Sequence, residues 1–234
     1  MPLVPDLDVT ADLAAAAAGA WDRMAVLYSA VSQQVADAVT DGAGLPVVQS
    51  GDCTTSLGVV AGLQRTGADP GVVWFDAHGD VQTLETSTSG YLGGLPLRLL
   101  AGYRPELIAD ALGLRAVPED RIVLAGARDL DPPEVRYLAG AAIRRREVSD
   151  LTEADLPDGP LYVHLDVDVL DPGGLPGLIL PVSGGPGPAQ VGRALHMLRA
   201  TGRVAAVGIA CTWHPGQGAA ACLRPWLEGI FADS

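Results

Sequence analysis

Basic residues, cysteines and long apolar runs are all scarce in this sequence. Lys and Arg together number 15 of 234 residues, against 28 Asp and Glu, which gives a formal net charge of −13. We do not expect so acidic a chain to bind nucleic acid or an anionic membrane surface. No apolar run reaches the ~18 residues that a membrane span needs. Three cysteines, Cys53, Cys211 and Cys222, are too few for a disulfide framework, so we expect a protein of the reducing cytoplasm.

Apolar residues, in contrast, are abundant at 48%, and only 18% of residues are charged. This balance indicates a globular protein, and the length fits one domain, residues 1–234, with a large core. Segments typical of strands alternate with segments typical of helices, which predicts a doubly wound, mainly parallel α/β sheet. The expected strands are 45–49, 72–75, 121–127, 142–148, 161–169 and 204–211. The expected helices are 8–40, 54–64, 95–114 with an interruption near Pro105, one that starts at Pro132, 189–201 and 219–231.

One expected strand ends in two carboxylates and a histidine. Residues 72–75 are consecutive apolar residues, as in a strand buried on both faces of a parallel sheet. Asp76, His78 and Asp80 follow at spacings of two, so they should project the same way while the chain stays extended. Buried carboxylates without partners cost several kcal/mol each, and a divalent cation is the simplest partner for both.

The segment 161–172, with the sequence LYVHLDVDVLDP, repeats this pattern. Its alternate residues are apolar, and Asp166 and Asp168 fall on the opposite face near the end of the strand. His164 lies on that face too, and we interpret it as a core or supporting residue and not as a ligand. Parallel sheets bind ligands beyond the carboxyl ends of their strands, so neighbouring strands would bring ligands together. The candidate metal ligands from the two strands are Asp76, His78, Asp80, Asp166 and Asp168.

These segments resemble the arginase/agmatinase (ureohydrolase) family over about residues 46 to 215. The sequences DAHGD at 76–80 and DVDVLDP at 166–172 resemble its two metal-ligand signatures. TLETSTSGYLGG at 83–94 resembles its substrate loop, and two further segments, 126–134 and 174–186, are similar to family segments. The resemblance implies a three-layer α/β/α fold, one or two Mn2+ ions and hydrolysis of a C–N bond in a small guanidino compound. It also implies a homo-oligomer.

The resemblance further assigns roles to individual residues. It implies that Asp76 and Asp166 bridge two metal ions, with His78 and Asp168 completing one site and Asp80 the other. Oxygen-rich ligation with one imidazole suits manganese better than zinc. Beside their ligand role, His78 and Asp80 are the candidate catalytic residues. The candidates for substrate contact are Thr83, Ser87, Ser89, Asp131 and Thr212, and Asp131 is equally well placed to cap the helix that starts at Pro132.

Three positions depart from the family pattern. Cys53 stands where a histidine ligand is expected, and it is either a metal ligand or a small buried apolar residue. Gly93 stands where arginases carry a histidine thought to shuttle protons. His214 is either a replacement for that histidine or a loop histidine without a role, and we favour the second. Thr212 stands where a glutamate would bind the guanidinium group. Cys53 together with the GYLGG loop is similar to the N-hydroxyarginine hydrolase of D-cycloserine biosynthesis.

These departures leave alternatives open. A protein that lacks the shuttle histidine and the guanidinium-binding carboxylate could bind metal or a small metabolite without turning it over. A third possibility is a histone-deacetylase-like amidohydrolase, whose metal ligands also come from loops of an α/β sheet. The paired signatures and the GYLGG loop favour the ureohydrolase interpretation.

Overall fold

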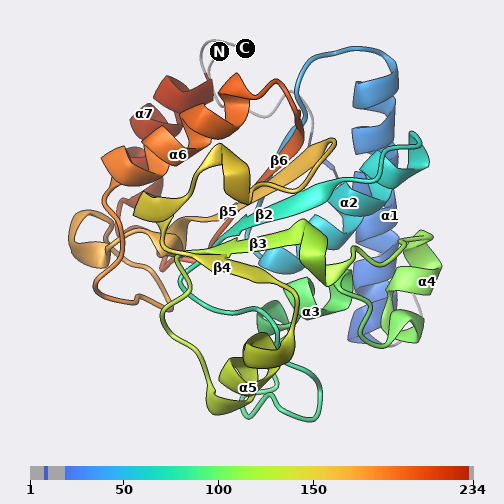
Figure 1. Cartoon of the computed structure of the whole chain (residues 1–234), viewed down its shortest axis with the longest axis horizontal. Coiled ribbons are helices and arrows are strands. Elements are labelled where there is room, and N and C mark those ends of the chain that lie inside the picture. Colours follow the sequence, from blue (N-terminus) through green and yellow to red (C-terminus); the bar gives the residue numbers. More distant parts are fainter. Residues whose placement is uncertain (1–7, 10–18, 232–234) are drawn as a thin grey trace.

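A six-stranded sheet forms the centre of the computed structural model, which describes residues 8–9 and 19–231 (Figure 1). The strand order is β1-β6-β5-β2-β3-β4, and every pair of neighbours is parallel. The strands are β1 (Val47–Ser50), β2 (Gly71–Phe75), β3 (Ile122–Ala125), β4 (Arg144–Arg146), β5 (Leu161–Asp166) and β6 (Val204–Ala210). The α-helices are α1 (Ala20–Thr40), α2 (Ser56–Arg65), α3 (Pro96–Leu100), α4 (Ala109–Leu112), α5 (Pro132–Gly140), α6 (Pro188–Ala200) and α7 (Ala219–Phe231).

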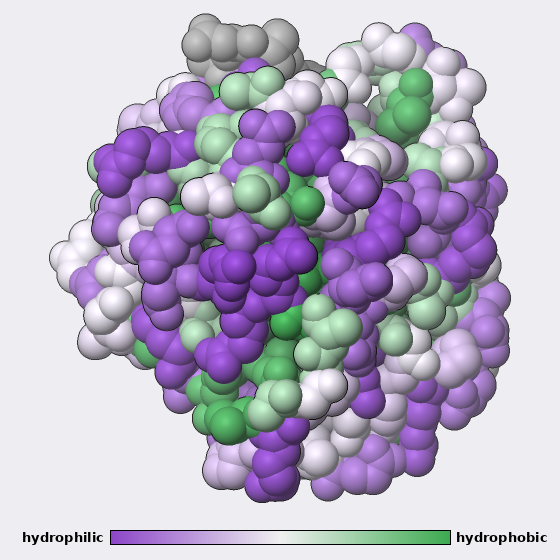
Figure 2. All heavy atoms as spheres, viewed as in Figure 1, coloured by the Kyte–Doolittle hydropathy of each residue, from purple (hydrophilic) through white to green (hydrophobic). Residues whose placement is uncertain are grey.

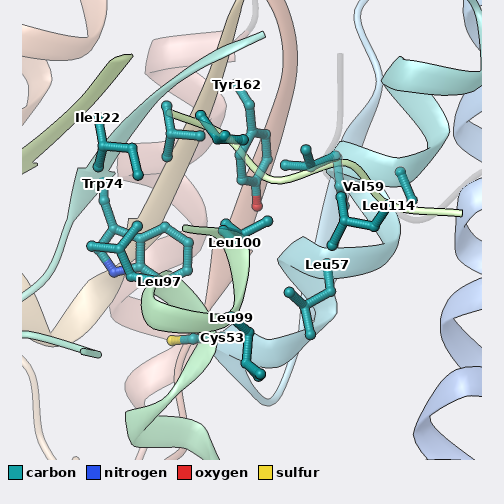
Figure 3. Packing of buried hydrophobic residues seen from close by; sticks show 14 of the residues in the cluster. Cys53, Leu57, Val59, Trp74, Leu97, Leu99, Leu100, Leu114, Ile122 and Tyr162 are labelled. Atoms are coloured by element: carbon teal, nitrogen blue, oxygen red, sulfur yellow. The ribbon is translucent and has the colours of Figure 1, made fainter. Parts of the chain in front are cut away.

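Helices cover both faces of the sheet, which confirms the predicted α/β/α architecture. On one face, Trp74 of β2 and Tyr162 of β5 pack with apolar residues of α1 to α5 (Figure 3). On the other face, Phe75 and Leu165 pack with α6 and α7. Trp74 and Phe75 are fully buried although they are neighbours, as expected for a strand that has protein on both sides. Burial of each such side chain stabilises the fold by about 1.5–3 kcal/mol.

Most expected elements are present, but two expectations were wrong in extent. The strand predicted over 161–169 ends at Asp166, because the Asp166 side chain accepts a hydrogen bond from the Asp168 amide (2.8 Å) and turns the chain. The helix predicted over 95–114 is interrupted near Pro105 as expected, but the interruption is longer: α3 and α4 are short, and a turn and the 3-10 helix Pro105–Leu107 separate them. Of the helix predicted over 8–40, residues 8 and 9 are not helical and 10–18 lie outside the described residues.

The surface of the described chain is mostly hydrophilic on the face that Figure 2 shows, and its apolar residues form small patches. No helix within the described ranges is both long and apolar enough to span a membrane.

Candidate metal and active site

Two neighbouring central strands deliver the first carboxylates of the site. Phe75 of β2 is paired with Leu165 of β5, so Asp76 and Asp166 follow at the same edge of the sheet. Each carboxylate then starts a turn: Asp76 Oδ1 accepts from the His78 amide (2.7 Å), and Asp166 Oδ1 accepts from the Asp168 amide (2.8 Å). The residues two positions later therefore converge because of these turns, and not because the strands stay extended as we had expected.

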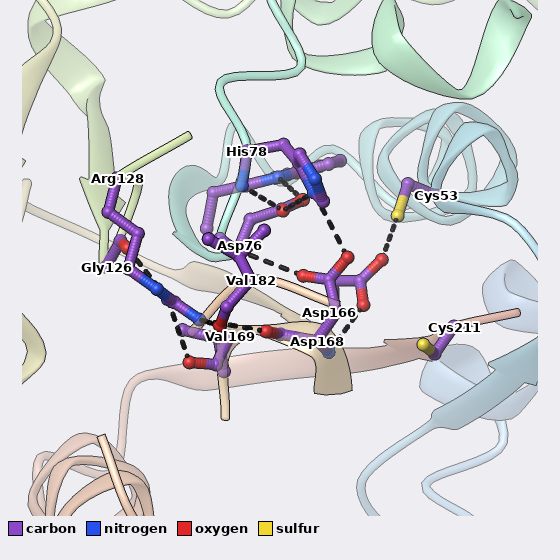
Figure 4. A network of polar contacts seen from close by, with 12 residues as sticks. Cys53, Asp76, His78, Gly126, Arg128, Asp166, Asp168, Val169, Val182 and Cys211 are labelled. Carbon is purple, nitrogen blue, oxygen red and sulfur yellow. Dashed lines mark hydrogen bonds and ion pairs between the residues drawn. The ribbon is translucent and has the colours of Figure 1, made fainter. Parts of the chain in front are cut away.

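His78 lies between carboxylates of both strands (Figure 4). Its Nδ1 is 3.1 Å from Asp168 Oδ2 and 3.4 Å from Asp76 Oδ1. The Ala77 amide donates to the other oxygen of Asp168 (3.2 Å), which fixes that carboxylate against the chain after β2. One ligand atom each from Asp76, His78 and Asp168 lie within 4.8 Å of one another, so this trio could hold a metal ion.

Asp80 reaches the same cluster through an unusual backbone conformation. Its φ is +53°, in the left-handed region that few non-glycine residues adopt. The preceding residue must be small, since a Cβ on Gly79 would lie 2.7 Å from Glu134 Oε1. The Asp80 side chain is buried, and its Oδ2 has no hydrogen-bond partner in the part of the chain that the structure describes. An acceptor left bare in this way is suited to a cation.

Cys53 approaches the cluster from the other side (Figure 4). It begins the 3-10 helix Cys53–Thr55, which Asp52 caps by accepting from the Thr54 amide (2.8 Å). The Cys53 thiol is buried and donates to Asp166 Oδ2 (2.9 Å). Burial, together with the negative charge of Asp166, holds the pKa of this thiol well above its ordinary value.

The cluster has an excess of negative charge. Burial and the charge of Asp76 raise the pKa of Asp80 well above its ordinary value, and burial and the charge of Asp168 do the same for Asp166. Burial lowers the pKa of His78, but its hydrogen bonds with Asp168 and Asp76 outweigh this and raise it to about 11. In the absence of a cation, the cluster therefore retains protons at neutral pH.

His164 contributes a second possible metal group. The side chain of His164 is buried, as are Cys53 and Asp76, and burial lowers the pKa of His164 to about 3. A ring nitrogen of His164, the Cys53 thiol and a carboxylate oxygen of Asp76 lie within 4.8 Å of one another. The two groups of possible ligands thus share Asp76.

A cavity of about 270 Å³ opens over these residues. Its lining includes seven carboxylates: Asp76, Asp80, Asp129, Asp131, Glu134, Asp166 and Asp168. Of the expected substrate contacts, Ser87, Ser89, Asp131 and Thr212 line the cavity. Thr83 is not among the described lining residues, because its amide and hydroxyl contact Thr86 Oγ1 within the loop. Asp131 is the N-cap residue of α5 and also accepts a hydrogen bond from Gln82 Nε2 (2.7 Å).

Tyr91 occupies the space beside Gly93. A Cβ on Gly93 would lie 2.4 Å from the phenol oxygen of Tyr91, so the ring fills the direction in which a side chain at residue 93 would point. The phenol donates to Asp52 Oδ2 (2.9 Å), and burial together with the Asp52 charge holds its pKa above the ordinary value. His214, by contrast, is exposed and absent from the described lining. The group beside residue 93 is therefore the Tyr91 phenol.

Sequence reasoning missed several residues that build the site. Glu134 is buried and accepts from the amides of Val81 (3.2 Å) and Asp131 (3.0 Å). The D-x-x-E spacing at the start of α5 is a capping-box signal that could have found it. Cys211 also lines the cavity.

Arg128 was also missed, although it holds the loops around the cluster together (Figure 4). Its guanidinium donates to the carbonyl oxygens of Gly126, Asp168, Val169, Val182 and Ser183. No local sequence pattern predicts that Arg128 connects these loops, because all five acceptors are backbone atoms.

Comparison with known proteins identifies the family. The sequence profile of the family described as "Arginase family" matches residues 5–212. The chain belongs to the arginase family. Within it, the arginase of Bacillus subtilis is 34% identical over 167 residues, which cover 65% of this chain and 56% of that protein. The arginase of Staphylococcus aureus (strain MRSA252) is 34% identical over 155 residues, covering 60% of this chain and 51% of that protein.

Solved arginase structures agree with this fold. The crystal structure of arginase from Bacillus subtilis superposes with a TM-score of 0.82 at 25% identity, covering 98% of this chain and 84% of that one. Arginase from Bacillus cereus gives a TM-score of 0.81 at 26% identity, covering 92% and 80%. The chain nevertheless spans only about half the length of the curated arginases that it matches.

Proposed function

We propose that this arginase-family hydrolase depends on manganese and cleaves a C–N bond of a guanidino, N-hydroxyguanidino or amidino compound. The observation that carries the proposal is the buried cluster of four aspartates and one imidazole at the base of an acidic cavity. The donor set is rich in oxygen, which favours manganese over zinc. The unpartnered Asp80 Oδ2 and the raised pKa values of Asp80 and Asp166 fit a site that is completed by a cation.

Asp76, His78 and Asp168 would hold the first ion, with Asp166 beside them. A divalent cation held there supplies a Lewis acid and lowers the pKa of a coordinated water. Asp80 Oδ2, which is buried at the cluster, is placed to accept a proton from water. The Tyr91 phenol lies at the edge of the cavity and would donate a proton to a leaving group by giving up its hydrogen bond with Asp52.

The cavity favours a cationic or strongly hydrogen-bonding substrate. Asp129 and Asp131 at its wall can accept hydrogen bonds from an amino group, and Gln82 holds Asp131 in place. Thr212 offers a guanidinium group no charge, since its side chain is a neutral alcohol, and its hydroxyl hydrogen is donated to the Gly51 carbonyl (2.7 Å). An N-hydroxyguanidino group is less basic than a guanidino group, so it needs this missing carboxylate less. We therefore favour an N-hydroxyguanidino compound, in line with the similarity of the Cys53 and GYLGG motifs to N-hydroxyarginine hydrolase.

The proposal is tested by assaying the purified chain with Mn2+ against arginine, N-hydroxyarginine and agmatine. We expect turnover of at least one compound, with N-hydroxyarginine the fastest. Asp76→Ala should abolish manganese content and activity together, whereas Asp110→Ala, which changes an exposed residue of α4, should leave both intact. Activity that persists in Asp76→Ala would refute the metal assignment.

A second candidate function is metal or metabolite binding without turnover. Gly93 and Thr212 favour it, because neither supplies the acid-base or charged group expected at its position. The same substrate panel decides between the two, since turnover clearly above the background of Asp76→Ala excludes the second. We also propose a homo-oligomer in the cytoplasm, and light scattering of the purified chain tests the assembly.

A further inference from the structure

His164 carries a nitrogen that the proposed manganese site does not use. The residue lies on β5 two positions before Asp166 and is 1% exposed. Its ring stacks on Trp74, its paired residue on β2, with ring centroids 3.7 Å apart. Nδ1 lies 3.1 Å from the Tyr162 hydroxyl, but Nε2 has no hydrogen-bond partner among the described residues. A buried polar atom without a hydrogen-bond partner costs about 1–3 kcal/mol of stability, so a ligand bound to Nε2 would explain why a histidine is found here.

The surroundings of His164 supply the rest of a metal site. A ring nitrogen of His164, Cys53 Sγ and an oxygen of Asp76 lie within 4.8 Å of one another, and all three residues are buried. They come from three separate elements: the 3-10 helix before α2, strand β5 and the end of strand β2. Figure 3 shows Cys53 at the border of the apolar cluster that contains Trp74 and Tyr162.

We propose that His164 Nε2, the Cys53 thiolate and Asp76 bind a second divalent cation, and that this position selects zinc or cobalt over manganese. A thiolate and an imidazole with one carboxylate form a donor set that zinc and cobalt prefer, whereas manganese prefers oxygen ligands. Three protein ligands leave a coordination position open, as in catalytic zinc sites. The protein would then hold two different metals that share Asp76.

Neighbouring side chains hold each ligand in an orientation that suits this role. Trp74 Nε1 donates to Asp76 Oδ2 (3.1 Å), and the His78 amide donates to Oδ1 (2.7 Å), so the carboxylate cannot rotate freely. The Tyr162 hydroxyl can accept the Nδ1 hydrogen of His164, which leaves the lone pair on Nε2. Cys53 would exchange its hydrogen bond with Asp166 for the metal and release a proton.

This inference deepens the proposed function by naming the metal chemistry of the same site, but its test does not require turnover. Chelator-treated protein is loaded with one equivalent of Mn2+ and then titrated with Co2+ while the near-ultraviolet spectrum is recorded. We expect a thiolate-to-cobalt charge-transfer band that saturates at one Co2+ per chain. His164→Gln should weaken cobalt binding by at least about tenfold, as loss of a ligand contact usually does, and should leave the Mn2+ in place.

Two matched cysteine variants identify the thiol. Cys53→Ser should lose the band, whereas Cys211→Ser, which changes the other cysteine of the cavity, should keep it. X-ray absorption of the unmutated protein loaded with Zn2+ supplies a readout that no variant can confound by misfolding, and it should show both sulfur and imidazole scattering. An all-oxygen environment around zinc, a band that depends on Cys211, or unchanged cobalt affinity in His164→Gln would overturn the proposal.

Failure of this inference can be told apart from failure of the proposed function. A chain that turns over its substrate without a cobalt–thiolate band refutes the mixed-metal site alone. A chain that shows the band but hydrolyses none of the compounds refutes the proposed activity alone.

Discussion

Replacing Asp80 by asparagine should stabilise the metal-free protein and weaken the stabilisation that manganese provides. In the metal-free protein, Asp80 lies buried beside Asp76, Asp166 and Asp168, and its pKa is raised well above its ordinary value by burial and by the Asp76 charge. The folded chain therefore holds a proton that the unfolded chain has lost above pH ~4. Stability from this group is fully present below that pH and is lost as pH rises through the folded-state pKa.

The size of the effect follows from proton linkage. Each pH unit across which the folded chain binds one more proton than the unfolded chain lowers the free energy of unfolding by about 1.4 kcal/mol. Asp80→Asn removes one such group and one potential buried charge, so at pH 8 it should raise the free energy of unfolding of the metal-free protein by about 1–3 kcal/mol. For a chain of this length, that corresponds to an increase in Tm of roughly 2–12 °C.

With manganese this gain in the free energy of unfolding should be offset. A metal at 100 times its Kd stabilises the folded state by about 2.7 kcal/mol, and an amide in place of the Asp80 carboxylate should remove much of that gain. The assay is thermal unfolding at pH 5 and pH 8, in chelator and in Mn2+, with Asp110→Asn as a control that should alter neither condition. Two results would refute this reasoning: Asp80→Asn is less stable than the parent in chelator at pH 8, or Mn2+ raises its Tm as much as it raises that of the parent. Either result would show that the Asp80 carboxylate is not part of a cation site.

Three further changes test other parts of the site. Tyr91→Phe removes the phenol that hydrogen-bonds Asp52, and steady-state kinetics should show kcat lowered about 100-fold with KM little changed; an effect on KM alone would contradict its role as a proton donor. Arg128→Met removes five hydrogen bonds to loop carbonyls and should lower the free energy of unfolding by about 2–4 kcal/mol in urea titrations, whereas an unchanged midpoint would show that these loops are held in other ways. Thr212→Glu should lower KM for arginine about tenfold, or about 1.4 kcal/mol, by adding a carboxylate at the cavity wall; a higher KM would place the guanidinium group elsewhere.

The central part of the fold was predictable from the sequence because β2 and β3 are short, continuous apolar runs. The run 72–75 indicated a strand with protein on both faces, and the alternation in 161–166 placed β5 correctly. The residue at which β5 ends could not be predicted from the pattern of apolar residues. The period-two pattern continues through Val169, but a single hydrogen bond from the Asp168 amide to Asp166 outweighs it and turns the chain.

The part of the site that comes from one short segment could be predicted from the sequence. The part that is built by contacts between distant segments could not. Asp76, His78 and Asp80 lie in one motif, so their convergence could be expected. Tyr91 beside Gly93 and Arg128 among the loop carbonyls depend on contacts between segments that the sequence does not place together. For His164 the sequence favoured a core or supporting role over ligation, and only the structure shows that its Nε2 has no hydrogen-bond partner among the described residues.

The distance along the chain between the two halves of the cluster has a consequence for folding. Cys53 and Asp166 are 113 positions apart, and β5, which ends at Asp166, lies between β2 and β6 in the sheet. Contacts this remote form late, because the entropy of closing so long a loop must be overcome first. A cation therefore cannot guide the early steps of folding; it binds a sheet that is already assembled, and by slowing the separation of β2 from β5 it should prolong the lifetime of the native state.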